Sequence, residues 1–447
     1  MTAAAAADFA PWSPDFVADP YPAYAALRER SRADRVVWFE PTGQWLVPHH
    51  DDVTHLLRDR RLGRTYLHRF SHEEFGQRPP PPGHRMFHAL NGSGLLELEP
   101  PDHTRIRRLV SRAFTPRTVE RLRPTVERLA AGLVDELCEA GGGDLIARIA
   151  EPLPVAVIAE MLGVPLADRG LLRPWSAAIV GMFEMVPGKE PDPGTAERAE
   201  RAAAEFSAYL RGLIAERRAA PSDDLISALI AVQDDDGGAG AGGGAGAAGG
   251  AGADEGAGAG GASGARGGSG DRLTEQEMVS TCALLLNAGH EASVNATGNG
   301  WLALFRDPEQ LARLRAEPDA LLPTAVEELL RYDTPLQMFE RWVLEDIEIG
   351  GTVVPRGSEV ALLLGSANRD PARFRAPDRL DLARADNPHL GFGGGIHYCL
   401  GAPLARLELA ASFGALLRRA PGLRLTAEPA WQPGYVIRGL RELHVGL

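Results

Sequence analysis

The spacing of apolar residues along the chain is mostly that of helices. Over residues 115–231 apolar side chains recur three and four positions apart, most regularly in Val119–Ala140 and Ala196–Ala219. This spacing places them on one face of a helix. The same spacing covers Tyr21–Arg30 and Leu321–Arg331. The pattern therefore predicts a protein in which helices supply most of the core.

The longest predicted helix begins at a capping box. Thr274 is followed three positions later by Glu277, the arrangement in which each side chain satisfies the other residue's backbone N–H. Apolar residues then continue to about Phe305, before Asp307-Pro308 ends the pattern. About 30 residues at the helical rise span roughly 45 Å. Such a helix would cross the whole molecule.

Strand signals are short and scattered. They are Val36–Phe39, Trp45–Val47, a hairpin of Glu345–Ile349 and Thr352–Pro355 turning at Gly350-Gly351, and finally Leu423–Thr426 and Leu443–Val445. Helical segments run on without a convincing interdomain boundary. The prediction is one large domain, residues 1–447, that is mainly α with small β-sheets.

One segment has a composition of its own. Gly237–Gly270 contains 18 glycines and 11 alanines among 34 residues. Such a sequence cannot bury enough apolar surface to offset the entropy lost on ordering. We interpret residues 237–270 as a flexible Gly/Ala-rich insertion in a surface loop, without a catalytic role.

Charge and cysteine usage exclude several classes of function. The net charge of −13 disfavours nucleic acid as the main partner. Three widely spaced cysteines argue against a disulfide framework and for a reducing compartment. The N-terminal residues MTAAAAADFA lack a basic start, and no apolar run is long enough to span a membrane. A cytoplasmic protein that does not use a membrane is expected.

A glycine-rich loop, Gly391–Gly401, brings Cys399 to the start of a helical segment that has Pro403 in its first turn. Unpaired N–H groups and the helix dipole at that position favour a thiolate over a thiol. Glycines let a flat ligand approach the backbone closely. An isolated cysteine is more often a small buried apolar residue, so the surrounding pattern decides between these interpretations.

The pattern Phe392-x-x-Gly395-x-x-x-Cys399-x-Gly401 resembles the haem-binding loop of cytochromes P450. The longer run His389–Arg406 is similar to the soluble bacterial members of that family. The resemblance implies the cytochrome P450 fold, with the long central helix crossing a haem b whose iron takes Cys399 as its axial thiolate ligand. The loop residues that would contact the haem are Gly391, Phe392, Gly393, Leu400 and Gly401.

Haem propionates need cationic or hydrogen-bonding partners. His103 and Arg107 are four residues apart and share one helix face, in a segment that resembles the family's propionate-binding helix. Arg341 and His397 match the remaining propionate partners of the family.

The long helix carries Ala288-Gly289-His290-Glu291-Ala292-Ser293, which resembles the family's oxygen-activation segment. Ala288 and Gly289 match its small residues, although a close helix crossing would explain them equally well. Glu291 matches its acid, but Ala292 stands where the family has a threonine hydroxyl that helps deliver protons. Ser293 lies about 100° further round the helix. Protons could arrive through Glu291, Ser293 and ordered water, or a substrate hydroxyl could complete the path.

Two further features follow from the resemblance. Glu328 and Arg331 match a buried Glu-x-x-Arg pair with a folding role, for which the third partner is expected to be Arg379. The substrate pocket is expected to draw on a set of methionine and aromatic residues, which on base rates more often form plain core: Met86, Phe87, Met182, Phe183, Met185, Met338 and Phe339. As a pocket, this set favours an apolar and fairly bulky substrate.

The resemblance implies a haem-thiolate monooxygenase of secondary metabolism that uses O2 to hydroxylate or epoxidise a small hydrophobic molecule. No flavin, nicotinamide or iron–sulfur segment is evident, so electrons are expected from a ferredoxin and its ferredoxin reductase. One alternative is a haem-thiolate enzyme with atypical oxygen activation, by peroxide, by its substrate or in an oxidative coupling. Another is a haem sensor without catalysis.

Overall fold

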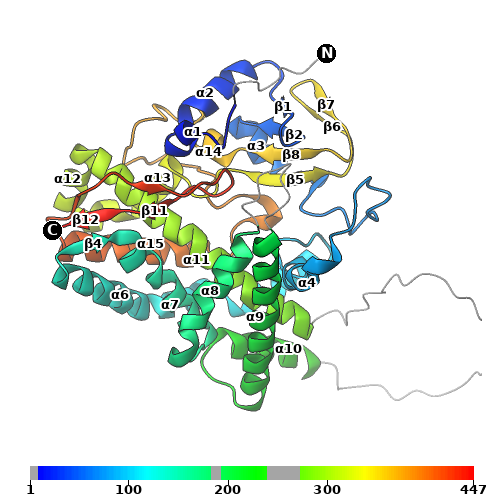
Figure 1. The fold of residues 1–447 in the computed structure, drawn as a ribbon, viewed down its shortest axis with the longest axis horizontal. Helices are drawn as coiled ribbons and strands as arrows, with labels where there is room; N and C mark the ends of the chain where they lie inside the picture. Colours follow the sequence, from blue (N-terminus) through cyan, green and yellow to red (C-terminus); the bar gives the residue numbers. More distant parts are fainter. Residues whose placement is uncertain (1–8, 183–192, 239–271) are drawn as a thin grey trace, which may run out of the picture.

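The computed structural model describes residues 9–182, 193–238 and 272–447. The long helices gather on one side, and the largest sheet lies on the other with the N-terminal helices α1 (Pro14–Ala18) and α2 (Tyr21–Arg30) (Figure 1). In the described part of the chain, no helix combines the length and apolar character that a membrane span requires.

Helix α11 (Glu275–Arg306) is the predicted long helix and has 32 residues. Both capping-box hydrogen bonds form between Thr274 and Glu277, so the predicted start is confirmed. The helix runs through the middle of the molecule (Figure 1) and is buried along most of its length. It packs against α7 (Pro152–Leu162), α13 (Pro318–Tyr332) and α15 (Ala402–Arg419).

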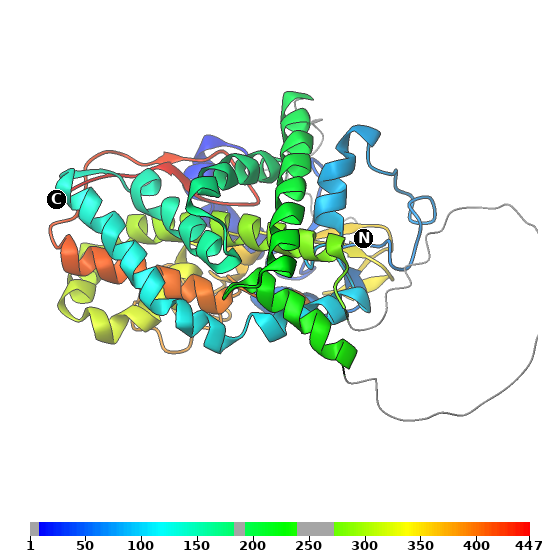
Figure 2. The ribbon, with the colours of Figure 1, turned by 90° about the horizontal axis from the view of Figure 1, so that it is seen from below.

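The predicted mainly helical fold is confirmed. The remaining helices are α3 (His50–Leu56), α4 (Arg85–Gly92), α5 (Asp102–Ala113), α6 (Pro116–Glu139), α8 (Arg169–Val180), α9 (Pro193–Ala219), α10 (Leu225–Gly238), α12 (Pro308–Ala316) and α14 (Leu364–Ala367). Helix α9 stands across the others in the view from below (Figure 2). The first two residues of the Gly/Ala-rich segment belong to the end of α10. Its residues 239–270 lie outside the described part of the chain.

The largest sheet has five strands in the order β1 (Val37–Phe39), β2 (Gln44–Val47), β8 (Glu359–Leu362), β5 (Phe339–Val343) and β3 (Leu62–Gly63). Strands β2 and β8 pair in parallel, which joins segments more than 300 residues apart in the sequence, and the other pairs are antiparallel. The sheet therefore ties the N-terminal part of the chain to the C-terminal part.

Three smaller sheets complete the fold. They are the hairpin β6 (Ile347–Ile349) with β7 (Thr352–Val354), the three strands β4 (Gly142–Asp144), β12 (His444–Gly446) and β9 (Arg424–Leu425), and the pair β10 (Ala430–Trp431) with β11 (Leu440–Glu442). The predicted hairpin turn is confirmed. Gly350 and Gly351 adopt φ values of 58° and 86°, which suits glycine in a two-residue hairpin turn.

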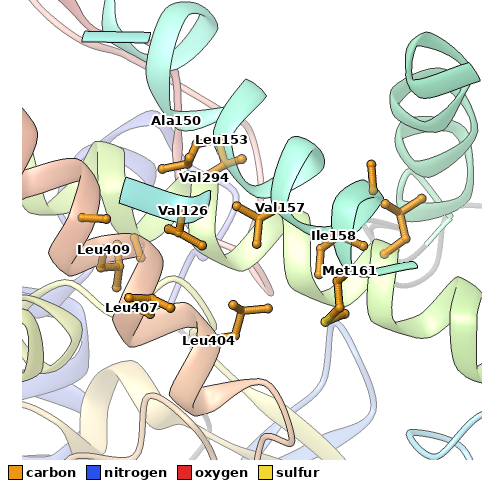
Figure 3. Close-up of a cluster of buried hydrophobic side chains, with 14 of the residues drawn as sticks. Val126, Ala150, Leu153, Val157, Ile158, Met161, Val294, Leu404, Leu407 and Leu409 are labelled. Atoms are coloured by element: carbon orange, nitrogen blue, oxygen red, sulfur yellow. The ribbon is translucent and has the colours of Figure 1, made fainter. Parts of the chain in front are cut away.

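The main core lies where α6, α7, α11 and α15 meet. Figure 3 shows Leu153, Val157 and Ile158 of α7 directed toward Val294 of α11 and toward leucines of α15 such as Leu407. All of these side chains are buried. This contact fixes the distance between α11 and α15. Helix α11 carries the predicted oxygen-activation segment, and α15 follows the predicted cysteine ligand.

A buried ionic network anchors α13. Glu328 and Arg331 are both fully buried, and Arg331 Nε and Nη2 donate to the Glu328 carboxylate at 2.8 and 2.9 Å. The third partner is a second cation, Arg384, whose Nε donates to Glu328 Oε2 at 3.0 Å. The expectation of Arg379 was wrong, because its side chain is exposed. Only its backbone takes part, since its carbonyl accepts a hydrogen bond from Arg331 Nη2.

The neighbouring acid, Glu327, holds both ends of the cysteine loop. Arg406 Nε and Nη2 donate to its two oxygens at 2.6 and 2.8 Å, and His389 Nε2 donates at 3.0 Å. Burial raises the pKa of Glu327, but these hydrogen bonds outweigh it and bring the value to about 2. Sequence analysis missed this residue, although it adjoins Glu328.

We predict that Arg331→Ala lowers the free energy of unfolding by about 3–5 kcal/mol, because it removes one of the two arginines that neutralise the buried Glu328 carboxylate. Arg379→Ala is the matched control and should change it by less than about 0.5 kcal/mol, as is usual for exposed side chains. Urea unfolding of the haem-loaded protein measures both. Equal losses in the two variants would contradict this assignment of the network.

Candidate functional site

The cysteine loop is shaped by glycines. Gly393 and Gly395 have φ values of 68° and 65°, and a Cβ on Gly395 would lie 2.2 Å from the backbone oxygen of Leu57. The loop therefore packs directly on the C-terminal end of α3. The N–H of Cys399 donates to the carbonyl of Phe392 at 3.0 Å, which closes the loop just before α15 begins at Ala402.

Cys399 is half-buried and takes part in no disulfide. Burial raises the pKa of its thiol, while backbone N–H groups of Gly401 and Ala402 and the charge of Arg107 act in the opposite direction. The helix start thus supplies the expected donors, but burial exceeds their effect on the pKa. Coordination to a metal ion would favour the thiolate against this effect of burial, because a thiol is deprotonated when it coordinates a metal.

The four predicted propionate partners converge beside this loop. The rings of His103 and His397 are 4.7 Å apart between centroids, and Arg107 Nη2 donates to the carbonyl of Tyr398 at 2.8 Å. The charge of Arg341, on β5, acts on His397. Segments separated by more than 200 residues in the sequence therefore meet in one basic cluster of His103, Arg107, Arg341 and His397.

Several hydrogen-bond donors in this basic cluster have no acceptor. Neither ring nitrogen of His103 has a hydrogen-bond partner, and neither does Nη2 of Arg341, although both side chains are buried. Burial lowers the pKa of His103 to about 4 and that of Arg341 to about 9. Buried donors without partners are rare because they are costly. Two carboxylates of a haem would satisfy them, so the residues present fit that group.

Glu99 is a buried acid beside the same basic cluster, and sequence analysis missed it. It accepts from His397 Nε2 at 3.2 Å and from the backbone N–H of Arg64 at 2.7 Å. Burial raises its pKa, but the hydrogen bonds and nearby cations leave it lower than usual. The sequence offers one signal, an acid directly before Pro100-Pro101 at the start of the propionate segment.

Helix α11 exposes small residues on one face. Ala288 and Ala292 are exposed although most of the helix is buried, and they lie four residues apart on the same side. Gly289 faces α7 instead, where a Cβ would lie 3.0 Å from Ile158 Cδ1. The small side chain at 289 therefore serves a close helix contact, whereas those at 288 and 292 leave room for a flat ligand.

The two polar residues of this segment point to different neighbours. Glu291 is half-buried, and burial raises its pKa. Ser293 is buried, and its Oγ donates to Glu408 Oε2 of α15 at 3.0 Å. Burial raises the pKa of Glu408 to about 8. Sequence analysis missed Glu408, whose only signal is an acid on the apolar face of α15.

The expected pocket residues divide into groups. Met86 and Phe87 lie on α4 and Met182 follows α8, all packed on the main core. Met338 instead belongs to an aromatic cluster with the N-terminal segment, and Phe339 is stacked by the guanidinium groups of Arg64 and Arg341. Phe183 and Met185 lie outside the described residues.

We predict that Glu408→Gln becomes increasingly more stable than the parent protein between pH 5 and pH 8. The folded protein holds a proton on Glu408 that the unfolded chain releases near pH 4.5, so the parent loses stability as the pH rises toward 8. The difference should grow by up to about 1.4 kcal/mol per pH unit. Urea unfolding at several pH values measures it, and a difference independent of pH would refute it.

Comparison with known proteins agrees with this geometry. The model of the family Cytochrome P450 matches residues 262–420. Cytochrome P450 monooxygenase PikC of Streptomyces venezuelae is 39% identical, over 96% of this chain and 92% of that protein. The 6-deoxyerythronolide B hydroxylase of Saccharopolyspora erythraea is 38% identical, over 97% and 98%.

Solved structures agree as well. CalO2 superposes with a TM-score of 0.81 at 32% identity, covering 98% of each chain. P450BioI in complex with a ligated acyl carrier protein gives 0.80 at 34% identity, covering 97% of this chain and all of that one. The chain belongs to the cytochrome P450 family and is a P450 monooxygenase that binds a cysteine-ligated haem.

Proposed function

We propose that this enzyme uses O2 and electrons from a ferredoxin and ferredoxin reductase to hydroxylate or epoxidise a small hydrophobic molecule. One observation carries the proposal: Cys399 lies beside a basic cluster in which the buried donors of His103 and Arg341 lack acceptors. Those residues would hold the haem by its iron and its propionates. The haem supplies the oxygen chemistry, and the protein supplies position, protons and a dry pocket.

The names of relatives support this reaction class. A mycinamicin IV hydroxylase/epoxidase of Micromonospora griseorubida is 36% identical over 94% of this chain. Hydroxylation and epoxidation are thus both present among proteins of this similarity. The sequence supports electron supply from a separate carrier, because we find no flavin, nicotinamide or iron–sulfur segment in it.

Residues of α11 define how protons could reach dioxygen. Ala292 is exposed on the small-residue face and has no hydroxyl with which to hold a water molecule. The hydroxyl of Ser293 donates its hydrogen bond to Glu408, away from that face. We propose that Glu291 delivers protons through ordered water. Ser293 would take part only by accepting a hydrogen bond from one of these water molecules. The alternative is a substrate hydroxyl placed beside Ala292, which the absence of a side-chain hydroxyl there favours.

Labelled oxygen tests the reaction. With ¹⁸O2, a ferredoxin, its reductase and NADPH, we expect the product to carry the label, and we expect the reduced protein with carbon monoxide to show the thiolate-type absorption band. Absence of that band would overturn haem ligation by Cys399. Oxygen taken equally well from peroxide alone would favour the peroxide-driven alternative.

Paired substrates test the proton path. If Glu291 and water suffice, a substrate and its deoxy analogue should give the same ratio of product to released peroxide. If a substrate hydroxyl completes the path, removal of that hydroxyl should lower the ratio by about 100-fold or more, the usual contribution of general acid–base assistance. Equal ratios would exclude the substrate-assisted path.

A further inference from the structure

A buried asparagine lies one helical turn beyond Glu291. Asn295 is fully buried on α11, and its Nδ2 donates to Glu291 Oε1 at 3.2 Å. A buried amide is costly unless it is hydrogen-bonded. The bond therefore fixes the amide and the carboxyl to each other, on the side of α11 that adjoins Ala292.

A glycine from a distant segment confines this amide. A Cβ on Gly439 would lie 1.7 Å from Asn295 Oδ1 and 2.3 Å from its Cγ, so no other residue fits at 439 without displacing the amide. The adjacent Arg438 is held in turn, because its carbonyl accepts from Asn299 at 3.0 Å and its Nε donates to Asp333 at 2.7 Å.

The orientation of the amide follows from charge. Oδ1 of Asn295 has no hydrogen-bond partner, whereas Nδ2 faces the Glu291 carboxylate. Reversing the amide would place two acceptor oxygens together and lose the hydrogen bond. Only the observed orientation gives Glu291 a donor.

The other charged groups around Glu291 do not replace this donor. Glu151, which precedes α7, carries a like charge that raises the pKa of Glu291, and Arg173 of α8 is paired with Glu151 at 2.5 Å. His290 is buried, and burial lowers its pKa to about 4, so that it stays neutral. Asn295 thus opposes both burial and Glu151 in their effect on the Glu291 carboxyl.

We propose that Asn295 is a positioning residue for Glu291: its amide, confined by Gly439, holds the carboxyl beside Ala292 and supports the ionised form. The proposal rests on the proton-delivery role proposed for Glu291. A group that carries protons must both take up and release them near the working pH, and a hydrogen bond to the ionised form keeps a half-buried carboxyl within that range.

The test compares two variants of Asn295 with a control. Asn295→Ala removes the donor, and Asn295→Asp replaces it with a second acid of the same shape. Thr297→Val is the control, since Thr297 is buried on the same helix and bonds to the Ser293 carbonyl but not to Glu291. The carbon monoxide spectrum and urea unfolding verify that each variant is folded and loaded with haem.

The first readout is independent of turnover. The carboxyl band of Glu291, assigned by its loss in Glu291→Gln, is titrated by infrared spectroscopy in the haem-loaded, substrate-free protein. We expect its midpoint to rise by about one pH unit in Asn295→Ala, further in Asn295→Asp, and not in Thr297→Val. An unchanged midpoint in both folded Asn295 variants would overturn the proposal.

The second readout is the ratio of product to released peroxide as a function of pH. In the Asn295 variants the pH profile of this ratio should shift in parallel with the infrared midpoint, while Thr297→Val keeps the parent profile. If Glu291→Gln lowers the ratio, a shifted midpoint with an unshifted profile in both Asn295 variants would also overturn the positioning role. If Glu291→Gln leaves the ratio unchanged, the proposed proton-delivery role fails, and the infrared titration still shows separately whether Asn295 governs Glu291.

Discussion

Two adjacent carboxylates on α13 hold the site together by pointing in different directions. Glu328 is directed into the protein, where Arg331 and Arg384 surround it, and Glu327 is directed toward the cysteine loop, where it receives Arg406 and His389. A buried ion pair gains little net stability over apolar packing, but losing one partner is costly. The network therefore acts as a constraint, because α13, the segment before the loop and the start of α15 must all be in place before all of these charges are satisfied.

The basic cluster beside the loop differs from the α13 network, because the protein alone does not satisfy its buried polar groups. His103 and Arg341 are taken out of water without acceptors, and burial lowers the pKa of each, so the protein alone carries an unfavourable cluster of donors. An anionic ligand relieves this cost, and a group that binds only the folded state stabilises that state by mass action. The stability of this region is consequently coupled to haem binding, whereas the α13 network is complete without a ligand.

The sequence predicted the parts of the fold that depend on local pattern. The capping box at Thr274 gave the start of α11, and the pair Gly350-Gly351 gave the β6–β7 turn, because both signals act within a few residues. Cys399 was assigned as the iron ligand because its loop resembles the family's haem-binding loop, in which glycines stand at set positions around the cysteine. The expectation of Arg379 was wrong because the sequence does not show which of the arginines in this segment folds inward, and the structure has Arg384 there instead.

Sequence analysis missed three buried acids for the same physical reason. Glu99, Glu327 and Glu408 each meet their partners across long stretches of chain, from His397, Arg406 and Ser293, respectively. No periodicity reports such pairings, and an isolated glutamate is most often a solvated surface residue. Burial alone distinguishes them, and burial is known only once the helices are packed.

Helix α11 shows why one helix can serve several purposes. Successive residues project about 100° apart, so neighbours in sequence face different elements. Gly289 contacts α7, Ser293 contacts Glu408 of α15, and Ala292 is exposed. A hydroxyl moved by one position along this helix is therefore a hydroxyl moved to another neighbour. Ser293 donates to Glu408 and does not replace the missing hydroxyl at Ala292. The proton delivery that we propose on that face therefore involves Glu291, water or the substrate itself.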